Sequence, residues 1–166
     1  MKTARDIVED FFAGPVRHRL PAPGQWREGN RPGEYRMRLP VEVDDEVGLF
    51  ELDLISTPDS QKPGVRFVLL FGRAVFRLDH HDEEHTNPFN HPAEVSLKIF
   101  GPHFHSWADN ARFGTEKSLP KALKNARPLP AGLEDASSAF QWFLNQTNIL
   151  PPDWPMPEWP RRTLLL

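Results

Sequence analysis

Residues 35–54, YRMRLPVEVDDEVGLFELDL, carry the clearest structural signal in the chain, because apolar and charged side chains alternate in both halves of this stretch. Apolar residues at every second position are typical of a β-strand that buries one face and exposes the other. Three consecutive acidic residues at 44–46 separate the two halves and indicate a turn. Pro40 has no N–H to donate, which favours an edge position for the first half. The stretch therefore predicts an antiparallel β-hairpin.

Three segments downstream continue the strand pattern. Residues 65–78 form a long apolar run that Gly72 interrupts, and the glycine predicts a bulge or a bend. Residues 79–92 are polar and predict a loop, after which alternation resumes over 93–99 and predicts a fourth strand. The segment HFHSW at 103–107 follows a Gly-Pro break, and we expect it to form a short fifth strand.

Helical patterns lie at the two ends of the chain. Thr3 is a suitable N-cap for a helix that ends at residue 13, and residues 14–33 are rich in proline and glycine and predict an irregular arm. A short helix within 117–126 and a longer helix over 133–148 are expected towards the C-terminus. Strands followed by helices predict an α+β fold, with an antiparallel sheet of four to five strands and with the N-terminal helix and C-terminal helices packed on one face.

The length of 166 residues predicts a single domain, over residues 1–150, followed by a tail over residues 151–166. The tail is rich in proline, contains Trp154 and Trp159, and ends in Leu164, Leu165 and Leu166. We expect the two tryptophans to pack the tail on its own domain. The alternatives are that the tail binds a protein partner as a polyproline II ligand, or that the leucines form an exposed patch for a partner.

Composition excludes several classes of protein. The chain has no cysteine, so it forms neither disulfides nor a thiolate zinc site. No apolar run approaches the roughly 20 residues that a membrane span needs, and we expect a cytoplasmic protein that does not contact the membrane. The net charge of −3 excludes a bulk polyanion binder, although arginines at 17, 19, 27, 31, 36 and 38 form a local basic stretch.

Six of the seven histidines lie between residues 80 and 105. Imidazole titrates near neutral pH and is the commonest metal ligand, so this region is where we expect chemistry. If the segment around His103 and His105 is extended, both rings project from one face, because side chains at i and i+2 share a face of a strand. We expect Arg77 and Asp79 to lie beside them. His81 and His85 lie in an acidic loop, where we expect them to add only polarity.

Two chemistries suit this group. In metal-free cleavage of a phosphodiester, His103 and His105, assisted by His91, act as acid and base, and Arg77 or Lys98 offsets the charge on phosphorus. In the alternative, His103 and His105 hold a divalent metal together with a third ligand from His91, His80 or Asp79. Asn87 and Trp107 are further candidate binding residues. The spacing leaves both chemistries open.

Four short motifs resemble a group of small bacterial and phage-associated proteins. The motifs are Arg-x-Asp at 77–79, Asn-Pro at 87–88, Gly-Pro-His-x-His-x-aromatic at 101–107, and Phe-Leu-x-x-x-Asn-Ile at 143–149. The resemblance covers residues 75–150, and Trp107 stands where the group has tyrosine. It implies that the histidine region is the shared part and that the context is a phage, a mobile element or a defence system. It implies no particular activity.

The function that we expect from the sequence is a histidine-dependent protein that processes nucleic acid, most concretely a ribonuclease-like phosphodiesterase. The alternative is a non-catalytic module that binds protein or nucleic acid. In that case, the histidines have a structural role or bind a stabilising metal.

Overall fold

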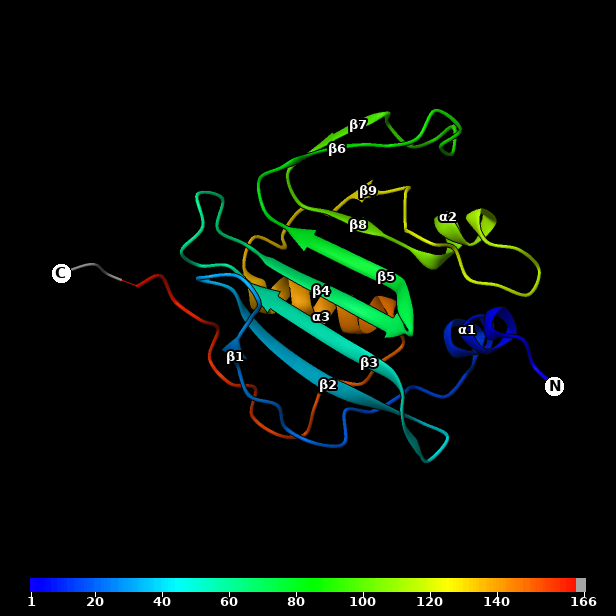
Figure 1. Ribbon diagram of the computed structural model, residues 1–166, viewed down its shortest axis with the longest axis horizontal. Helices are drawn as coiled ribbons and strands as arrows, with labels where there is room; N and C mark the ends of the chain where they lie inside the picture. The colour runs from blue at the N-terminus through cyan, green and yellow to red at the C-terminus, as the bar shows by residue number, and fades with distance from the viewer. Residues whose placement is uncertain (164–166) are drawn as a thin grey trace.

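Seven strands form the main antiparallel sheet in the computed structural model, which describes residues 1–163 (Figure 1). Their spatial order is β1-β2-β3-β4-β5-β8-β9, and β6 and β7 form a separate two-stranded sheet. The strands span β1 (Arg27–Glu28), β2 (Tyr35–Val43), β3 (Glu46–Ser56), β4 (Val65–Phe71), β5 (Arg73–His80), β6 (Glu84–Thr86), β7 (Lys98–Phe100), β8 (His103–His105) and β9 (Arg127–Pro128). The helices are α1 (Ala4–Ala13), α2 (Trp107–Asn110), the short 3-10 helix η1 (Ala111–Phe113) and α3 (Ala136–Gln146). The α+β class is confirmed.

The predicted hairpin is confirmed as β2 and β3, with Leu39 opposite Leu52 in register. Asp44 and Asp45 form the turn with positive φ values of 49° and 64°, a backbone conformation that aspartate tolerates better than most residues. The prediction of four to five strands in the sheet is wrong. The two-residue strands β1 and β9 are too short for a periodic pattern to reveal them.

The apolar run at 65–78 also contains two strands instead of one bent strand. Gly72 lies in the tight turn between β4 and β5 with a φ of 64°, a conformation that favours glycine. Leu69 pairs with Phe76 across the hairpin, and Phe71 pairs with Arg73. The glycine marked the position of the interruption, but apolar residues on both sides of it left a bend within one strand and a turn between two strands indistinguishable in the sequence.

The strand predicted over 93–99 is wrong for most of its length. Only β7 is extended there, and it pairs with β6, which lies inside the segment predicted as a loop. Residues 93–94 form a turn, in which the Val95 N–H donates to the Pro92 carbonyl. Because this segment turns away, β8 takes the place beside β5. We call residues 84–100, from β6 to β7, the flap; it extends above the main sheet in Figure 1.

The two terminal helices are confirmed, and the middle one is not. Thr3 caps α1 by accepting from the Asp6 N–H, and the predicted helix over 133–148 is confirmed as α3, which Asp135 caps. Residues 117–126 form bends and irregular chain, although Leu119 and Leu123 are buried at helical spacing, and Pro120 within the segment disfavours a helix there. The helix that the pattern missed is α2, which Ser106 caps after β8.

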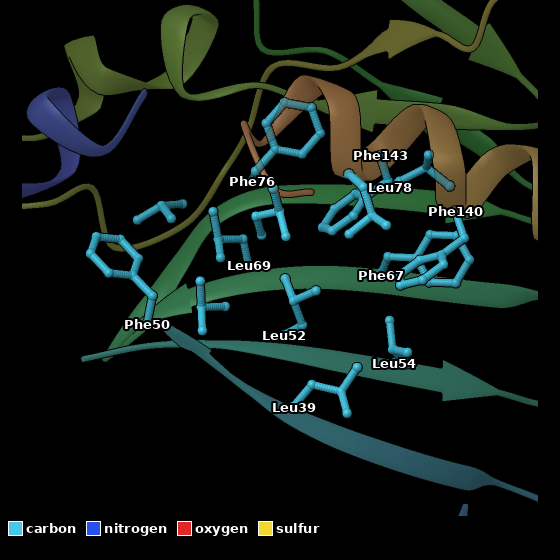
Figure 2. Close-up of a cluster of buried hydrophobic side chains, with 14 of the residues drawn as sticks. Leu39, Phe50, Leu52, Leu54, Phe67, Leu69, Phe76, Leu78, Phe140 and Phe143 are labelled. Carbon is cyan, nitrogen blue, oxygen red and sulfur yellow. The ribbon is translucent and has the colours of Figure 1, made fainter. Parts of the chain in front are cut away.

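The core lies between the sheet and α3 (Figure 2). Phe67 on β4 is fully buried and makes edge contacts with Phe140 and Phe143 of α3 at centroid distances of 5.3 and 5.6 Å. Leucines of β2, β3 and β4 complete this layer. At the other end, Phe11 of α1 stacks on Phe50. One face of the sheet is therefore apolar, which leaves the opposite face for polar residues.

The tail contacts the domain through its large side chains. Trp154, Met156 and Trp159 pack against the core. The Trp154 indole donates to the Leu20 carbonyl at 2.9 Å, and the Trp159 indole donates to the Ser137 hydroxyl at 3.0 Å. The terminal leucines, 164–166, lie outside the described residues. Within residues 1–163, no helix is long and apolar enough to cross a membrane.

We expect Phe67→Ala to lower the free energy of unfolding by about 3–5 kcal/mol, because it opens a cavity where three aromatic rings meet. Chemical denaturation measures this loss. Leu49→Ala is the control, since Leu49 is exposed at the β2–β3 tip. Equal losses in the two variants would contradict the placement of the core.

The ion pair between Arg127 and Asp109, at the edge of the main sheet, predicts a pH dependence of stability. Arg127 of β9 donates from Nε and Nη2 to both Asp109 oxygens, at 2.6 and 2.7 Å. Arg127 lowers the pKa of Asp109 below its ordinary 3.8, against the opposing effect of burial. A lowered folded-state pKa means that the contribution is present above pH 4 and is lost as the pH falls through the folded value.

We therefore expect Asp109→Asn to reduce the free energy of unfolding at pH 7 by about 1–2 kcal/mol, since a charge-assisted pair is removed. The difference from the unmodified protein is expected to shrink below pH 4. Denaturation curves at pH 7 and pH 3 check both points. A difference that grows on acidification would overturn the assignment.

Candidate functional site

The polar face of the sheet, opposite α3, brings the predicted site residues together. Strand β5 pairs with β8 so that Asp79 lies opposite His103 and Arg77 opposite His105. On the other side of β5, Arg66 of β4 lies opposite Asp79. Because residues two apart on a strand share a face, all five side chains project to the same side. The expected juxtaposition of His103 and His105 with Arg77 and Asp79 is present.

Asp79 is the centre of this group and is fully buried. Its Oδ1 accepts from Arg66 Nε, and its Oδ2 accepts from Arg77 Nε at 2.6 Å. Burial works to raise the pKa of the Asp79 carboxyl, but His105 and the positive charges of Arg77 and Arg66 outweigh it and hold that pKa well below its usual range. The carboxylate is therefore ionised and fixed in position at neutral pH.

His105 lies beside this carboxylate with none of its surface exposed. Arg77 Nη2 donates to His105 Nε2 at 2.8 Å, and the Asp79 Oδ2 lies 3.6 Å from the same nitrogen. The other ring nitrogen, Nδ1, is buried and has no hydrogen-bonding partner. Burial lowers the pKa of His105 to about 4, against the opposing effect of Asp79. The ring is neutral at pH 7, and one of its nitrogens lacks a partner.

His103 has a defined tautomer. Its Nδ1 donates to the Gly101 carbonyl at 2.8 Å, which leaves the lone pair on Nε2 when the ring is neutral. Nε2 lies 3.6 Å from Asp79 Oδ2. Burial lowers the pKa of His103, and the hydrogen bond to Gly101 opposes that effect only in part. His103 therefore presents a free nitrogen lone pair beside Asp79.

His85, which we expected to add only polarity, completes the group. It lies on β6 of the flap, and its Nε2 donates to the Lys124 carbonyl at 3.0 Å. Its ring centroid lies 5.1 Å from that of His103 and 4.8 Å from that of His105. The pairing of β6 with β7 brings it over the main sheet. In the sequence, the feature that could have indicated a role for His85 is its separation from Asn87 by two positions. His103 and His105 are separated by the same number of positions.

The three rings of His85, His103 and His105 suit a metal ion. One nitrogen from each lies within 4.8 Å of the other two, and the ring centroids are 4.8 to 5.3 Å apart. Three imidazoles on a tetrahedral ion, with metal–nitrogen distances of about 2 Å, have centroids about 5 Å apart. His85 and His103 each donate their other N–H to a backbone carbonyl, as histidine ligands usually do.

Asn87 holds the flap in place. Its Nδ2 donates to the carbonyls of Ser96 and Ala126 at 2.9 and 3.0 Å, and its Oδ1 accepts from the Ala126 N–H at 2.7 Å. The same Oδ1 lies 3.2 Å from His85 Nε2. The predicted binding residue therefore positions His85, and all of its strong hydrogen bonds are internal.

Two predicted histidines lie outside the cluster. His80 follows Asp79 along β5, so its side chain projects to the opposite face, where Nε2 donates to the Leu133 carbonyl at 2.7 Å. His91 donates from Nδ1 to the Pro88 carbonyl at 2.9 Å within its own turn. Neither belongs to the group of histidines that can share an ion, although both were candidate metal ligands.

Lys98 and Trp107 also lie outside it. Lys98 pairs with Glu84 at 2.9 Å across the flap strands, and both side chains are largely exposed. Trp107 begins α2 and packs into the main core. The strand that was expected to carry Lys98 into the site turns away, and the helix after Ser106 rotates Trp107 off the face shared by the histidines.

His81, which was not a candidate, lies at the outer edge of the site. Its Nε2 lies 3.8 Å from Asp79 Oδ1, and its ring centroid lies 6.3 Å from that of His103. Its Nδ1 is buried without a hydrogen-bonding partner. His81 therefore borders the cluster beside Asp79 and His103.

Burial bears on the choice between the two chemistries. Only 3% of His103 and none of His105 is exposed, so neither ring is accessible to a ribose or a phosphate in this structure. An acid–base pair must lie within hydrogen-bonding reach of the substrate, whereas a metal ligand need not, because the ion itself contacts the substrate. The geometry therefore favours metal ligation for this pair.

Comparisons with protein-family models, with curated proteins and with solved structures return no match. The function is therefore argued from the site itself.

We expect Asp79→Asn to lower the free energy of unfolding by about 3–5 kcal/mol, because it leaves two arginines without their buried counter-charge. Asp53 is the matched control: it is also buried on this face, between Arg36 and Arg38, but at 3.7 and 3.6 Å without direct hydrogen bonds. We expect Asp53→Asn to lower the free energy of unfolding by about 1 kcal/mol, because its ion pairs are long and partly exposed. Urea denaturation at pH 7 checks the difference, and equal costs would contradict the central role of Asp79.

Proposed function

We propose that this protein is a metal-dependent hydrolase of phosphodiester bonds in nucleic acid, with the ion held by His85, His103 and His105. The observation that carries the proposal is the convergence of one nitrogen from each ring within 4.8 Å. The buried Nδ1 of His105 has no partner, and an unsatisfied buried polar atom is costly. For this nitrogen to bind the ion, Nε2 must carry the ring proton and give up the hydrogen bond that it accepts from Arg77.

The surrounding residues suit this chemistry. A divalent ion on three imidazoles keeps a position for water, lowers the pKa of that water and polarises a phosphoryl oxygen. Asp79 orients Arg77 by accepting its hydrogen bond, and Arg77 in turn donates to His105, whose Nε2 also lies 3.6 Å from Asp79 Oδ2. Arg66 gives Nε to Asp79 and keeps 41% of its side chain exposed, so its terminal nitrogens are placed to contact a phosphate.

The choice of nucleic acid as substrate rests on the arginines of the polar face. Arg36 and Arg38 on β2, Arg66 on β4 and Arg77 on β5 all project from it, and guanidinium groups match phosphate geometry. The motif resemblance supports placing the activity in a phage, a mobile element or a defence system.

A second candidate function is a non-catalytic module in which the same ion is structural. The observation that favours it is the position of the ligands: His85 belongs to the flap, and His103 and His105 belong to the main sheet. An ion there would join the two sheets, and two of its three ligands, His103 and His105, are buried. Metal binding is common to both functions, and cleavage of nucleic acid separates them.

The first measurement is metal binding. We expect the protein to bind one equivalent of zinc or cobalt(II), with the absorption spectrum of a tetrahedral cobalt site. His85→Gln is expected to weaken binding at least about 100-fold, because it removes one of three ligands. His91→Gln is the matched control, since His91 is also half-buried but lies outside the cluster. Absence of stoichiometric binding would refute the metal site.

The second measurement is cleavage of labelled RNA and DNA by the same proteins, with and without chelator. We expect cleavage that chelator abolishes, that His85→Gln reduces more than about 100-fold, and that His91→Gln retains. Cleavage that is lost in His103→Gln but is insensitive to chelator would instead support metal-free acid–base catalysis. Stoichiometric metal without any cleavage would support the structural role.

A further inference from the structure

A basic pocket of about 840 Å³ opens beside the histidine cluster. It lies at the end of the sheet marked by the arrowheads of β3 and β5 in Figure 1, between the loop over residues 57–64 and the start of β2. Arg66 and His81 line the pocket and also contact Asp79, so the pocket and the cluster share a wall. The candidate metal ligands themselves lie behind that wall.

The charge of the lining is positive. Arg31, Arg36, Lys62 and Arg66 face two carboxylates, Glu34 and Glu83. Glu34 is already paired with Arg36 at 3.1 Å, and Arg66 is paired with the buried Asp79. Among residues 1–163, the side chains of Arg31 and Lys62 have no hydrogen-bonding or ion-pair partner. Glu83 is the remaining carboxylate of the lining, 3.7 Å from His81 Nε2, so Arg31 and Lys62 leave the pocket with net positive charge.

Two further observations describe the wall of the pocket. The buried Arg36 Nε lacks a well-directed hydrogen bond, although Glu34 lies nearby. The loop that carries Lys62 is held directly against His81, because Gly64 leaves no room for a side chain: an added Cβ would lie 2.5 Å from the His81 Cβ. This packing brings the loop that carries Lys62 up to His81. Ile55 and Val65 give the pocket an apolar strip beside the basic groups.

We infer that this pocket binds a phosphate group of the substrate, with a nucleotide as the ligand class. Arginine and lysine around a partly apolar pocket bind a phosphate through charge-assisted hydrogen bonds and leave room for the attached sugar and base. The volume exceeds what a free phosphate needs. Binding of a nucleotide phosphate in the pocket does not depend on the proposed function. The inference rests on that function in one respect, namely that the phosphate belongs to a nucleic-acid strand that continues towards His85, His103 and His105.

The test measures binding of adenosine 5′-monophosphate to the metal-free protein by calorimetry or by NMR chemical-shift changes. Adenosine and inorganic phosphate are tested in the same way. We expect the monophosphate to bind, adenosine to bind at least about tenfold more weakly, and inorganic phosphate to compete. Binding is expected to weaken as salt rises, because the lining charges are partly exposed. Equal binding of adenosine would overturn the inference.

The matched variants are Arg31→Gln/Lys62→Gln in the pocket and Lys117→Gln/Lys121→Gln outside it, where both lysines are exposed. The first pair is expected to weaken monophosphate binding at least about tenfold and the second less than about twofold. No binding by the unmodified protein, or equal loss in the two double variants, would overturn the phosphate site. Because no metal is present, these outcomes are independent of the metal-binding and cleavage tests.

Discussion

The carboxylate of Asp79, ionised and buried between Arg66 and Arg77, is the interaction on which the polar side of this protein depends. A buried charge is tolerated only when counter-charges and hydrogen bonds surround it, and here both arginines donate directly to it. Arg77 also donates to His105, so the carboxylate orients the arginine and the arginine orients the histidine ring. Strand pairing places the two histidines of β8 beside the carboxylate, and hydrogen bonds to Arg77 and to the Gly101 carbonyl fix their rings. The site is thus built into the regular part of the sheet.

The division between the two faces of the sheet makes this arrangement possible. On one face, aromatic and aliphatic side chains pack against α3 and exclude water, which provides most of the stabilisation. On the other face, the same strands carry arginine, aspartate and histidine at the alternating positions. A single strand such as β5 therefore supplies Leu78 to the core and Arg77 and Asp79 to the site. Rigid placement of this kind suits a metal centre, whose ligands must keep fixed distances.

The flap lies on one side of the site and the pocket on another. The flap covers His103 and His105 and contributes His85, while Asn87 ties it to the chain at Ala126. The pocket lies on the opposite side of Asp79 and reaches it through Arg66 and His81. The proposed metal and phosphate sites are therefore neighbours that share Asp79 as their common support.

Alternation of side chains was enough to predict the β2–β3 hairpin, the shared face of His103 and His105, and their closeness to Arg77 and Asp79. These features depend on the local geometry of extended chain, in which residues two apart point the same way. The role of His85 was not predictable, because it depends on the pairing of β6 with β7 and on hydrogen bonds from residues about forty positions away. The strand expected at 93–99 failed for a related reason: its alternation was real, but a strand also needs a partner, and β8 occupies that position. The sequence by itself determined which side chains share a face, whereas only the tertiary structure decided which faces meet, because long-range strand pairing and burial are properties of the whole fold.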